Sequence, residues 1–256
     1  MELVPPVGLR KYTNRLSPNG FQRIYHNHIR KCAGTSINKA LIKSLGGDND
    51  AYEVLANKTF HKMNLKYGSV VGWNASAINR GSFFFGFSHE PLHNLELDEN
   101  TFVFSLLRDP VKRAVSHFNM LKDIINEGGK HPALIVEKNF AFGDFTHFLE
   151  NIPKAHLCAQ LYNFSKTYDL KEAIDTLRRS VNYIGDIHSS EKKLIPYLSK
   201  EFNLNINYSH LRKSKSSINL SKKQHDRLKD LLSEEIHFYK KAQPLFGVNQ
   251  ERKSGT

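Results

Sequence analysis

One short stretch constrains the fold of this chain more than any other. Residues 24–45 have the pattern of a strand, a tight loop and a helix: β-compatible residues end at Arg30, and apolar residues recur at helical spacing from Ile37 to Leu45. The loop between them, residues 31–36, has the sequence Lys-Cys-Ala-Gly-Thr-Ser. The first N–H groups of a helix have no partner within the helix and lie at its positive end. The stretch therefore predicts an anion site at a strand-to-helix junction.

The side chains of this loop favour a phosphate or sulfate group. Lys31 adds a cation, and the hydroxyls of Thr35 and Ser36 can donate hydrogen bonds or cap the helix. The loop is not a Walker A motif, because that motif places its lysine directly after the second glycine, whereas Lys31 precedes Gly34. Taken alone, the string also fits an ordinary helix N-terminus. For Cys32, a small residue that fits a tight turn is favoured over a thiol activated by the helix.

A second strand-to-helix junction follows at residues 101–116. The continuous apolar run 101–107 fits a parallel strand covered on both faces. Asp109 is a good N-cap and Pro110 suits the first helical position. Arg108, at the end of the strand, is a forked and permanently charged group for phosphate, and Ser116 can donate a hydroxyl from the helix. The chain thus has two candidate anion-binding loops, each at a strand-to-helix junction.

Both loops resemble signatures of one enzyme family. Residues 28–36, His-Ile-Arg-Lys-Cys-Ala-Gly-Thr-Ser, resemble the H-x-P-K-x-A-G-T-S loop of carbohydrate-type sulfotransferases that use 3′-phosphoadenosine 5′-phosphosulfate (PAPS). Residues 108–116, Arg-Asp-Pro-Val-Lys-Arg-Ala-Val-Ser, resemble the family's R-D-P-x-x-R-x-x-S signature. Arg30 stands where the first pattern has proline, so a fixed φ is lost at the loop entry, and its charge either adds to the anion site or faces solvent. Arg113 either reinforces the phosphate clamp or pairs with Asp109 or another acid.

The resemblance implies an α/β fold: a three-layer sandwich with a central, largely parallel sheet, of the P-loop NTPase-like sulfotransferase type. The alternation of strands and helices along the chain supports the same class independently. The domain is expected to cover residues 21–248, after an N-terminal arm of residues 1–20 and before a frayed tail of residues 249–256. A capping box at Ser221 predicts one long final helix.

The resemblance also assigns roles to residues. The donor's phosphosulfate end would be held by Lys31, Cys32, Ala33, Gly34, Thr35 and Ser36. Its 3′-phosphate would be held by Arg108 and Ser116. A late basic loop would close over the 3′-phosphate and adenine through Arg212, Lys213 and Lys215.

A histidine is the expected catalytic base. The buried strand 82–88 ends at His89, which resembles the family's histidine that deprotonates the acceptor hydroxyl, and a neutral imidazole can accept a proton near pH 7. Glu90 and His93 are alternatives. Lys31 would be the second catalytic residue, neutralising charge on the departing phosphate. His26 and His28 share a strand face, but no third metal ligand is suggested, and the scheme requires no metal.

The predicted function is transfer of a sulfuryl group from PAPS to an acceptor hydroxyl, with a glycan preferred as acceptor. The net charge of +12 is compatible with an anionic donor and a polyanionic acceptor. Two alternatives remain: a P-loop-type kinase acting on a small hydroxylated substrate, and a non-catalytic basic module that binds anions or glycans. Nucleic acid is not an expected partner.

The sequence contains no secretory-signal pattern at its start and no run of about 20 apolar residues that would span a bilayer. A cytoplasmic enzyme is therefore expected. Cys32 and Cys158 are the only cysteines, so no disulfide framework supports the fold.

Overall fold

The computed structural model describes residues 17–56, 61–129, 133–209 and 215–248. Its centre is a seven-stranded sheet with the order β2-β3-β4-β1-β5-β6-β7. The strands are β1 (Arg23–Asn27), β2 (Lys62–Leu65), β3 (Gly68–Gly72), β4 (Phe85–Ser88), β5 (Thr101–Leu107), β6 (Tyr183–Asp186) and β7 (Gly247–Val248). The strands from β3 to β6 pair in parallel, and β2 and β7 pair antiparallel at the two edges. The predicted largely parallel sheet is confirmed.

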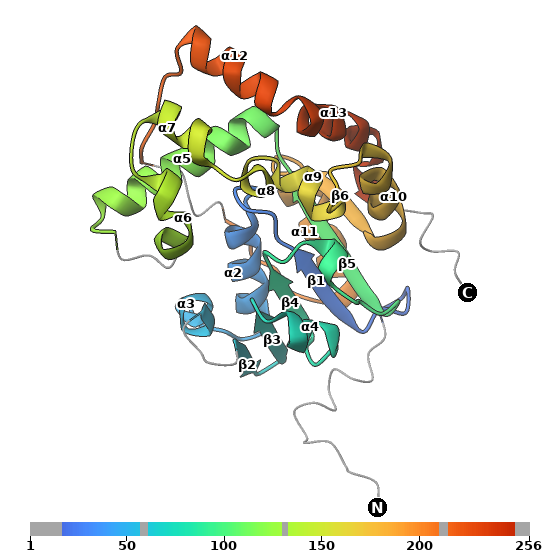
Figure 1. Cartoon of the computed structure of the whole chain (residues 1–256). Coiled ribbons are helices and arrows are strands. Elements are labelled where there is room, and N and C mark those ends of the chain that lie inside the picture. The colour runs from blue at the N-terminus through green and yellow to red at the C-terminus, as the bar shows by residue number, and fades with distance from the viewer. Residues whose placement is uncertain (1–16, 57–60, 130–132, 210–214, 249–256) are drawn as a thin grey trace, which may run out of the picture.

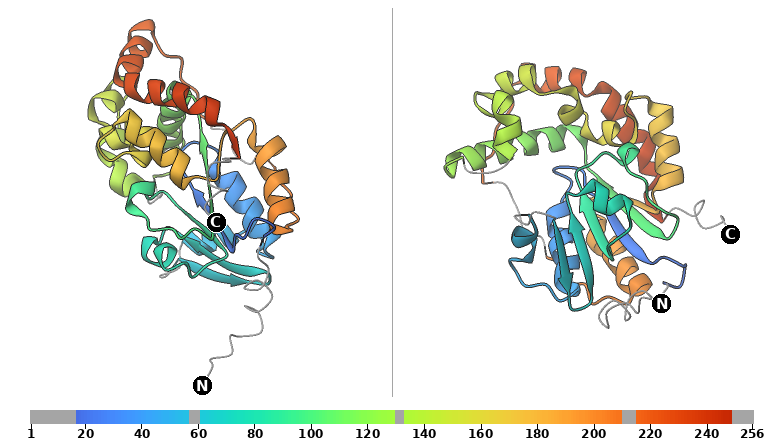
Figure 2. Two further views of the ribbon diagram at one scale, coloured as in Figure 1. Left: turned by 90° about the vertical axis from the view of Figure 1, so that its right-hand side faces the viewer. Right: turned by 60° about the horizontal axis from the view of Figure 1, so that its bottom comes forward.

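Helices cover both faces of this sheet. The longer ones are α2 (Gly34–Ser44), α3 (Ala51–Ala56), α4 (Ala75–Asn79), α5 (Pro110–Asn126), α6 (Ala133–Ala141), α7 (Phe145–Asn151), α8 (Lys154–Leu157), α9 (Ala159–Phe164), α10 (Leu170–Ser180), α11 (Ile195–Phe202), α12 (Lys222–Leu231) and α13 (Ser233–Ala242). Single turns occur at η1 (Leu92–Asn94), η2 (Ser190–Leu194) and η3 (Gln243–Leu245). In Figures 1 and 2, α2 and α11 lie on one face of the sheet, and α4, α9 and α10 lie on the other. The expected three-layer α/β sandwich is therefore present.

The apolar core has two parts. The larger cluster surrounds the sheet, where the continuous apolar strands β4 and β5 are buried on both faces, as expected for parallel strands between helices. The smaller cluster joins α5, α6, α7, α8 and α12. These helices form a separate layer beyond the end of β5, on the side to which that strand leads (Figure 1). Residues from this helical layer therefore have access to the loops at the carboxyl ends of the strands.

Local sequence signals account for several element boundaries. Asp109 caps α5 by accepting a hydrogen bond from the N–H of Lys112 at 2.8 Å, and Pro110 is its first residue, as predicted. The capping box of Ser221 and Gln224 opens α12, also as predicted. The single long final helix was wrong, because the chain breaks at Leu232 into α12 and α13. Beyond the break, Glu235 is buried, which the sequence alone did not predict.

Of the expected arm, only residues 17–20 lie within the described part of the chain, and residues 249–256 lie outside it. Among the residues described, none of the helices combines the length and the apolar composition that a bilayer span needs.

Candidate active site

The two loops singled out by sequence lie next to each other. β1 and β5 are parallel neighbours, with Asn27 opposite Ser105, so both strands deliver their following loops to the same edge of the sheet. β4 flanks β1 on the other side, with Asn27 opposite Ser88, and brings His89 to the same edge. The chain moves from β1 first to one side of the sheet and later to the other. The carboxyl ends of strands at such a switch point are where open α/β sheets bind ligands.

The first loop is built from an unusual backbone. A turn closes it, in which the N–H of Cys32 donates to the carbonyl of Ile29 at 3.3 Å. Lys31 and Ala33 both have left-handed backbones, with φ of 69° and 62°. L-residues adopt this region at a cost, and such strain gathers at functional sites. The strained backbone at Lys31 and Ala33 is therefore consistent with a functional role of this loop.

The helix after this loop begins without a side-chain cap. Its N-cap is Ala33, and within the part of the chain that the structure describes no side chain accepts a hydrogen bond there. The prediction that Thr35 or Ser36 caps α2 was wrong, because the helix already starts at Gly34 and both residues lie inside its first turn. An uncapped first turn directs its N–H groups outward, as an anion site needs.

Gly34 is required by a close approach rather than by its backbone. A Cβ atom on Gly34 would lie 2.0 Å from Cδ2 of the His28 ring. The first turn of α2 thus packs directly on an imidazole at the end of β1. Any side chain at this position would push the helix start away from the loop.

His28 belongs to a buried row of histidines. Its ring lies 5.0 Å from that of His26 and 4.4 Å from that of His89. Asn38 of α2 links the first two: Nδ1 of His26 contacts Oδ1 of Asn38 at 2.6 Å, and Nδ2 of Asn38 contacts Nδ1 of His28 at 3.3 Å. Burial lowers the pKa of His26 to about 3 and that of His28 well below its usual value. Both are therefore neutral packing residues near pH 7.

Cys32 is a structural residue of the loop. It is buried, and burial raises the pKa of its thiol to about 12. Its Sγ lies 3.6 Å from Oε1 of Gln160. The structure supports the prediction of a small residue in a tight turn and opposes an activated thiolate.

Arg108 joins the second loop to the first. Its Nη1 donates to the carbonyl of Lys31 at 3.1 Å. Its own backbone is held on both sides by Gln160, which accepts from the Arg108 N–H at 2.7 Å and donates to the Arg108 carbonyl at 2.9 Å. Its Nε is buried and has no partner among the described residues. Burial lowers the pKa of Arg108. A partly desolvated guanidinium with an unpaired donor is suited to an oxyanion.

Arg113, in contrast, is part of the fold. It is fully buried, and its Nε lies 3.3 Å from Oε1 of Glu235 on α13. It also donates to the carbonyls of His156 and Leu157. Of the two alternatives, the ion pair is therefore observed, with Glu235 as the acid. Ser116 lies further along α5 and is half-buried.

His89 is held through one of its ring nitrogens. Its Nδ1 lies 2.7 Å from the carbonyl oxygen of His28. A carbonyl oxygen can only accept, so Nδ1 carries the hydrogen and Nε2 carries the lone pair. Burial, and secondarily the charge of Arg30, lower the pKa of His89 to about 4. The imidazole is therefore neutral near pH 7, with one nitrogen able to accept a proton.

The two alternative bases point elsewhere. Oε1 of Glu90 accepts from Nδ2 of Asn94 at 2.7 Å, and Nδ1 of His93 contacts Oδ1 of Asn94 at 2.9 Å. His93 lies in the single turn η1. Of the three groups, only His89 is held by the backbone that leads into the first loop. Its position favours His89 as the base.

A model of the sulfotransferase family matches residues 16–242 of this chain, which include both loops and His89. The chain belongs to the sulfotransferase family. No curated protein matches it closely enough to count as a relative.

The late basic loop of this sulfotransferase is only partly placed. Arg212 and Lys213 lie outside the described residues. Lys215 has an 83% exposed side chain, whose Nζ lies 2.9 Å from Oε1 of Glu127. Glu127 caps the end of α5, eleven residues after Ser116, or about 16 Å along a helix. The structure therefore does not bring Lys215 to the loops around Arg108.

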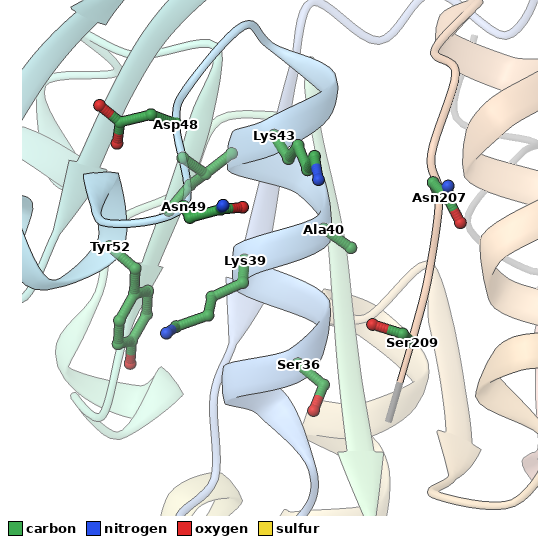
Figure 3. A pocket seen from close by; sticks show the side chains of 10 residues that line it. Ser36, Lys39, Ala40, Lys43, Asp48, Asn49, Tyr52, Asn207 and Ser209 are labelled. Atoms are coloured by element: carbon green, nitrogen blue, oxygen red, sulfur yellow. The ribbon is translucent and has the colours of Figure 1, made fainter. Parts of the chain in front are cut away.

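A cavity of about 410 Å³ runs along α2 and is lined at one end by Ser36, the last residue of the first loop. Figure 3 shows Ser36 at one end of it, with Lys39 and Lys43 along α2, Tyr52 on one side and Ser209 on the other. Volumes of this order accommodate a small ligand or part of a larger one. Within the described residues, no group of three or more His, Cys, Asp or Glu side chains is placed to hold a metal ion.

Sequence reasoning missed the polar residues that support the site. They are buried and hydrogen-bonded to residues of the two loops, to the histidines or to one another: Asn38, Glu137, Gln160 and Glu235. A buried Asn or Glu within an apolar helical stripe was the available signal, as Asn38 shows beside Ile37. Such a residue indicates that a buried hydrogen-bonding partner exists, but the sequence does not say which residue that partner is.

Proposed function

We propose that this sulfotransferase uses PAPS as its donor and transfers the sulfuryl group to a hydroxyl, with a carbohydrate as the preferred acceptor. One observation carries the proposal: Arg108, whose buried Nε has no partner among the described residues, bonds to the carbonyl of Lys31, three residues before α2 begins without a side-chain cap from that part of the chain. Two anion-directed groups are thus fixed side by side. A donor with phosphate at both its 5′ and 3′ positions matches such a pair.

The donor's two ends are assigned to different residues. The first-turn N–H groups from Gly34 to Ser36, with Lys31, take the 5′-phosphosulfate. Arg108 and Ser116 take the 3′-phosphate. The cavity between Ser36 and Ser209 gives room for the nucleoside, because it opens directly beside the phosphate loop. Arg212 and Lys213 remain assigned to closure over the donor, whereas Lys215 would first have to leave Glu127.

The reaction is an in-line displacement at sulfur. The acceptor hydroxyl forms a new S–O bond as the S–O bond to the 5′-phosphate breaks, and its proton passes to Nε2 of His89. Negative charge develops on the departing phosphate, where Lys31 and the loop N–H groups neutralise it. Positioning and charge neutralisation of this kind supply most of the rate in the related phosphoryl transfers.

A carbohydrate acceptor is supported by the type of signature and by charge. The Ala-Gly-Thr-Ser sequence of residues 33–36 and the histidine base resemble the carbohydrate branch of the family. The net charge of +12 favours encounter with an acidic glycan.

Calorimetric titration with 3′-phosphoadenosine 5′-phosphate, the spent donor, tests the proposal, with AMP and with ATP plus Mg²⁺ as comparisons. We expect micromolar binding that requires the 3′-phosphate. Arg108→Ala should weaken it at least about tenfold, since a charged hydrogen-bonding partner is lost. Lys112→Ala, an exposed change in the first turn of α5, four residues after Arg108, is the matched control.

Tighter binding of ATP with Mg²⁺ would replace the proposal with the kinase alternative. Binding of none of these nucleotides, with retained binding of an acidic glycan, would favour the non-catalytic module.

A further inference from the structure

Arg30 occupies the one position of the phosphate loop where this chain departs from its family's pattern. It is the second residue of the turn closed between Ile29 and Cys32, and Lys31 follows it with a φ of 69°. Turns with a positive φ at the third residue favour proline at the second, because proline fixes φ there. Arg30 lacks this fixed φ. A contact from another part of the chain therefore has to hold the loop entry.

Glu137 on α6 is the group that meets Arg30. Its Oε1 accepts a hydrogen bond from Nη1 of Arg30 in an ion pair. Glu137 is 0% exposed, whereas the Arg30 side chain remains 31% exposed. The two residues are 107 positions apart in sequence. The contact therefore ties the loop entry to the helical layer beyond the sheet.

The residues around Glu137 leave Arg30 as its charged partner. Its second oxygen, Oε2, lies 2.9 Å from Nε2 of His117, and Nδ1 of His156 lies 3.7 Å from Oε1. Burial lowers the pKa of His117 well below its usual value and lowers that of His156. Both imidazoles are neutral near pH 7, so Arg30 is the cation that balances the Glu137 carboxylate. A buried carboxylate that loses its cation is strongly destabilised.

Arg30 is also close to the proposed base. Its charge is the second cause, after burial, of the lowered pKa of His89. Arg30 therefore pairs with a buried acid and directly precedes Lys31 in the loop.

We propose that Glu137 is a positioning residue for the donor site: its buried ion pair with Arg30 fixes the entry of the phosphate loop, in place of proline. Glu137 itself does not touch the donor. The inference rests on the proposed function only for what the loop binds; the loop's own order can be measured without any ligand.

The test is a cycle of three variants: Glu137→Gln, Arg30→Pro and the double variant. Hydrogen exchange of the amides in residues 31–36 reports loop order, and calorimetry with 3′-phosphoadenosine 5′-phosphate reports the donor site. Glu234→Gln, which breaks the exposed ion pair with Lys154, is the matched control. Thermal unfolding verifies that each variant is folded.

We expect Glu137→Gln to speed exchange of the loop amides and weaken nucleotide binding, each about tenfold, while the amides of β5 stay protected. Arg30→Pro leaves the Glu137 carboxylate without its cation, so it should lower the thermal unfolding temperature, while loop exchange and nucleotide binding stay near wild type because proline itself fixes φ at the loop entry. Adding Glu137→Gln to Arg30→Pro should change either by less than about twofold, because proline has replaced the ion pair. Rescue by proline is a result that a merely structural role of Glu137 would not produce.

Two results would overturn the inference. One is unchanged loop exchange in folded Glu137→Gln. The other is an equal effect of Glu137→Gln in both backgrounds, which would mean that Glu137 acts through His117 and the helical layer. If wild-type protein fails to bind the nucleotide, the donor assignment fails, and the exchange data still decide the role of Glu137.

Discussion

The two loops that face the proposed donor are built in opposite ways. Residues 108–110 leave β5 and enter α5 through ordinary conformations, with a capping aspartate and a proline at the first helical position. Residues 31–34 leave β1 through two left-handed residues and enter α2 with no side-chain cap. The helix entry of the second loop is capped by its own sequence, and Gln160 also holds the Arg108 backbone. The first depends on distant partners.

The partners of the first loop come from several different elements of the fold. His28 packs under Gly34, Arg108 holds the Lys31 carbonyl, and Gln160 contacts Cys32. The comparison teaches that a loop whose N–H groups bind a ligand cannot also use those N–H groups for hydrogen bonds that stabilise the loop. Its order has to be supplied by buried polar groups from other elements, and the following predictions test that division.

The largest effect is expected from Lys31→Ala. Lys31 would stabilise charge that develops on the leaving phosphate, so its loss should lower kcat by about 10²–10³-fold. Nucleotide release with a glycan acceptor measures this rate. Arg108→Ala should instead act mainly on donor affinity, because its 3′-phosphate contact is present before and during the reaction. If both variants lost kcat and donor affinity to the same extent, the two loops would not have the separate roles in catalysis and donor binding that we expect.

Gly34→Ala should be the most damaging conservative change in the first loop. Its Cβ would overlap the His28 ring, and overpacking costs about 1–3 kcal/mol in the free energy of unfolding. Donor affinity should fall with it, since the helix start moves. Urea unfolding and nucleotide titration measure the two effects. In a His28→Ala background the same change should cost less, and an undiminished cost there would refute the packing explanation.

The sequence predicted the second loop almost completely. The apolar strand, the Asp109 cap and the Pro110 start all depend on neighbours within four residues, and the structure contains each of them. For the first loop, sequence predicted the strand, the helix and the anion-directed composition, but it placed the cap at Thr35 or Ser36. Backbone strain at Lys31 and Ala33 leaves no mark in residue type, because neither is glycine.

The supporting polar residues could not be predicted for a different reason. Glu137 meets Arg30, and Glu235 meets Arg113, across long separations in the chain. Which acid each arginine meets depends on how α6 and α13 pack against the rest of the fold. The same limit explains the break at Leu232, after which Glu235 becomes buried. Patterns in a single sequence predict the apolar faces and the caps of helices, but they do not predict ion pairs between residues far apart in the chain.

The buried histidines beside the first loop predict acid sensitivity. His26 and His89 have pKa values lowered to about 3 and about 4 in the fold, from about 6.5 when unfolded. The unfolded chain therefore binds more protons between pH 6.5 and about 4. Stability should be full above pH 6.5 and fall by up to about 1.4 kcal/mol per pH unit for each histidine below it.

Urea unfolding at pH values from 4.5 to 7.5 measures this slope. His89→Asn should make it shallower, whereas His225→Gln, on a 41% exposed side chain of α12, is the control. A slope that is the same in His89→Asn and wild type would show that His89 is not held neutral by the fold.

The smallest effect, and the sharpest test of the contrast, is expected from Asp109→Ala. The Asp109 carboxylate caps α5 through the N–H of Lys112 at 2.8 Å, so its loss should cost about 1 kcal/mol in the free energy of unfolding. Asp144→Ala, which removes the cap of α7 at 2.9 Å, should cost a similar amount. Donor affinity should stay within about twofold of wild type, because Gln160 still holds the Arg108 backbone on both sides. A tenfold loss of nucleotide affinity in Asp109→Ala would mean that the second loop relies on its local cap to place the phosphate clamp, as the first relies on distant contacts.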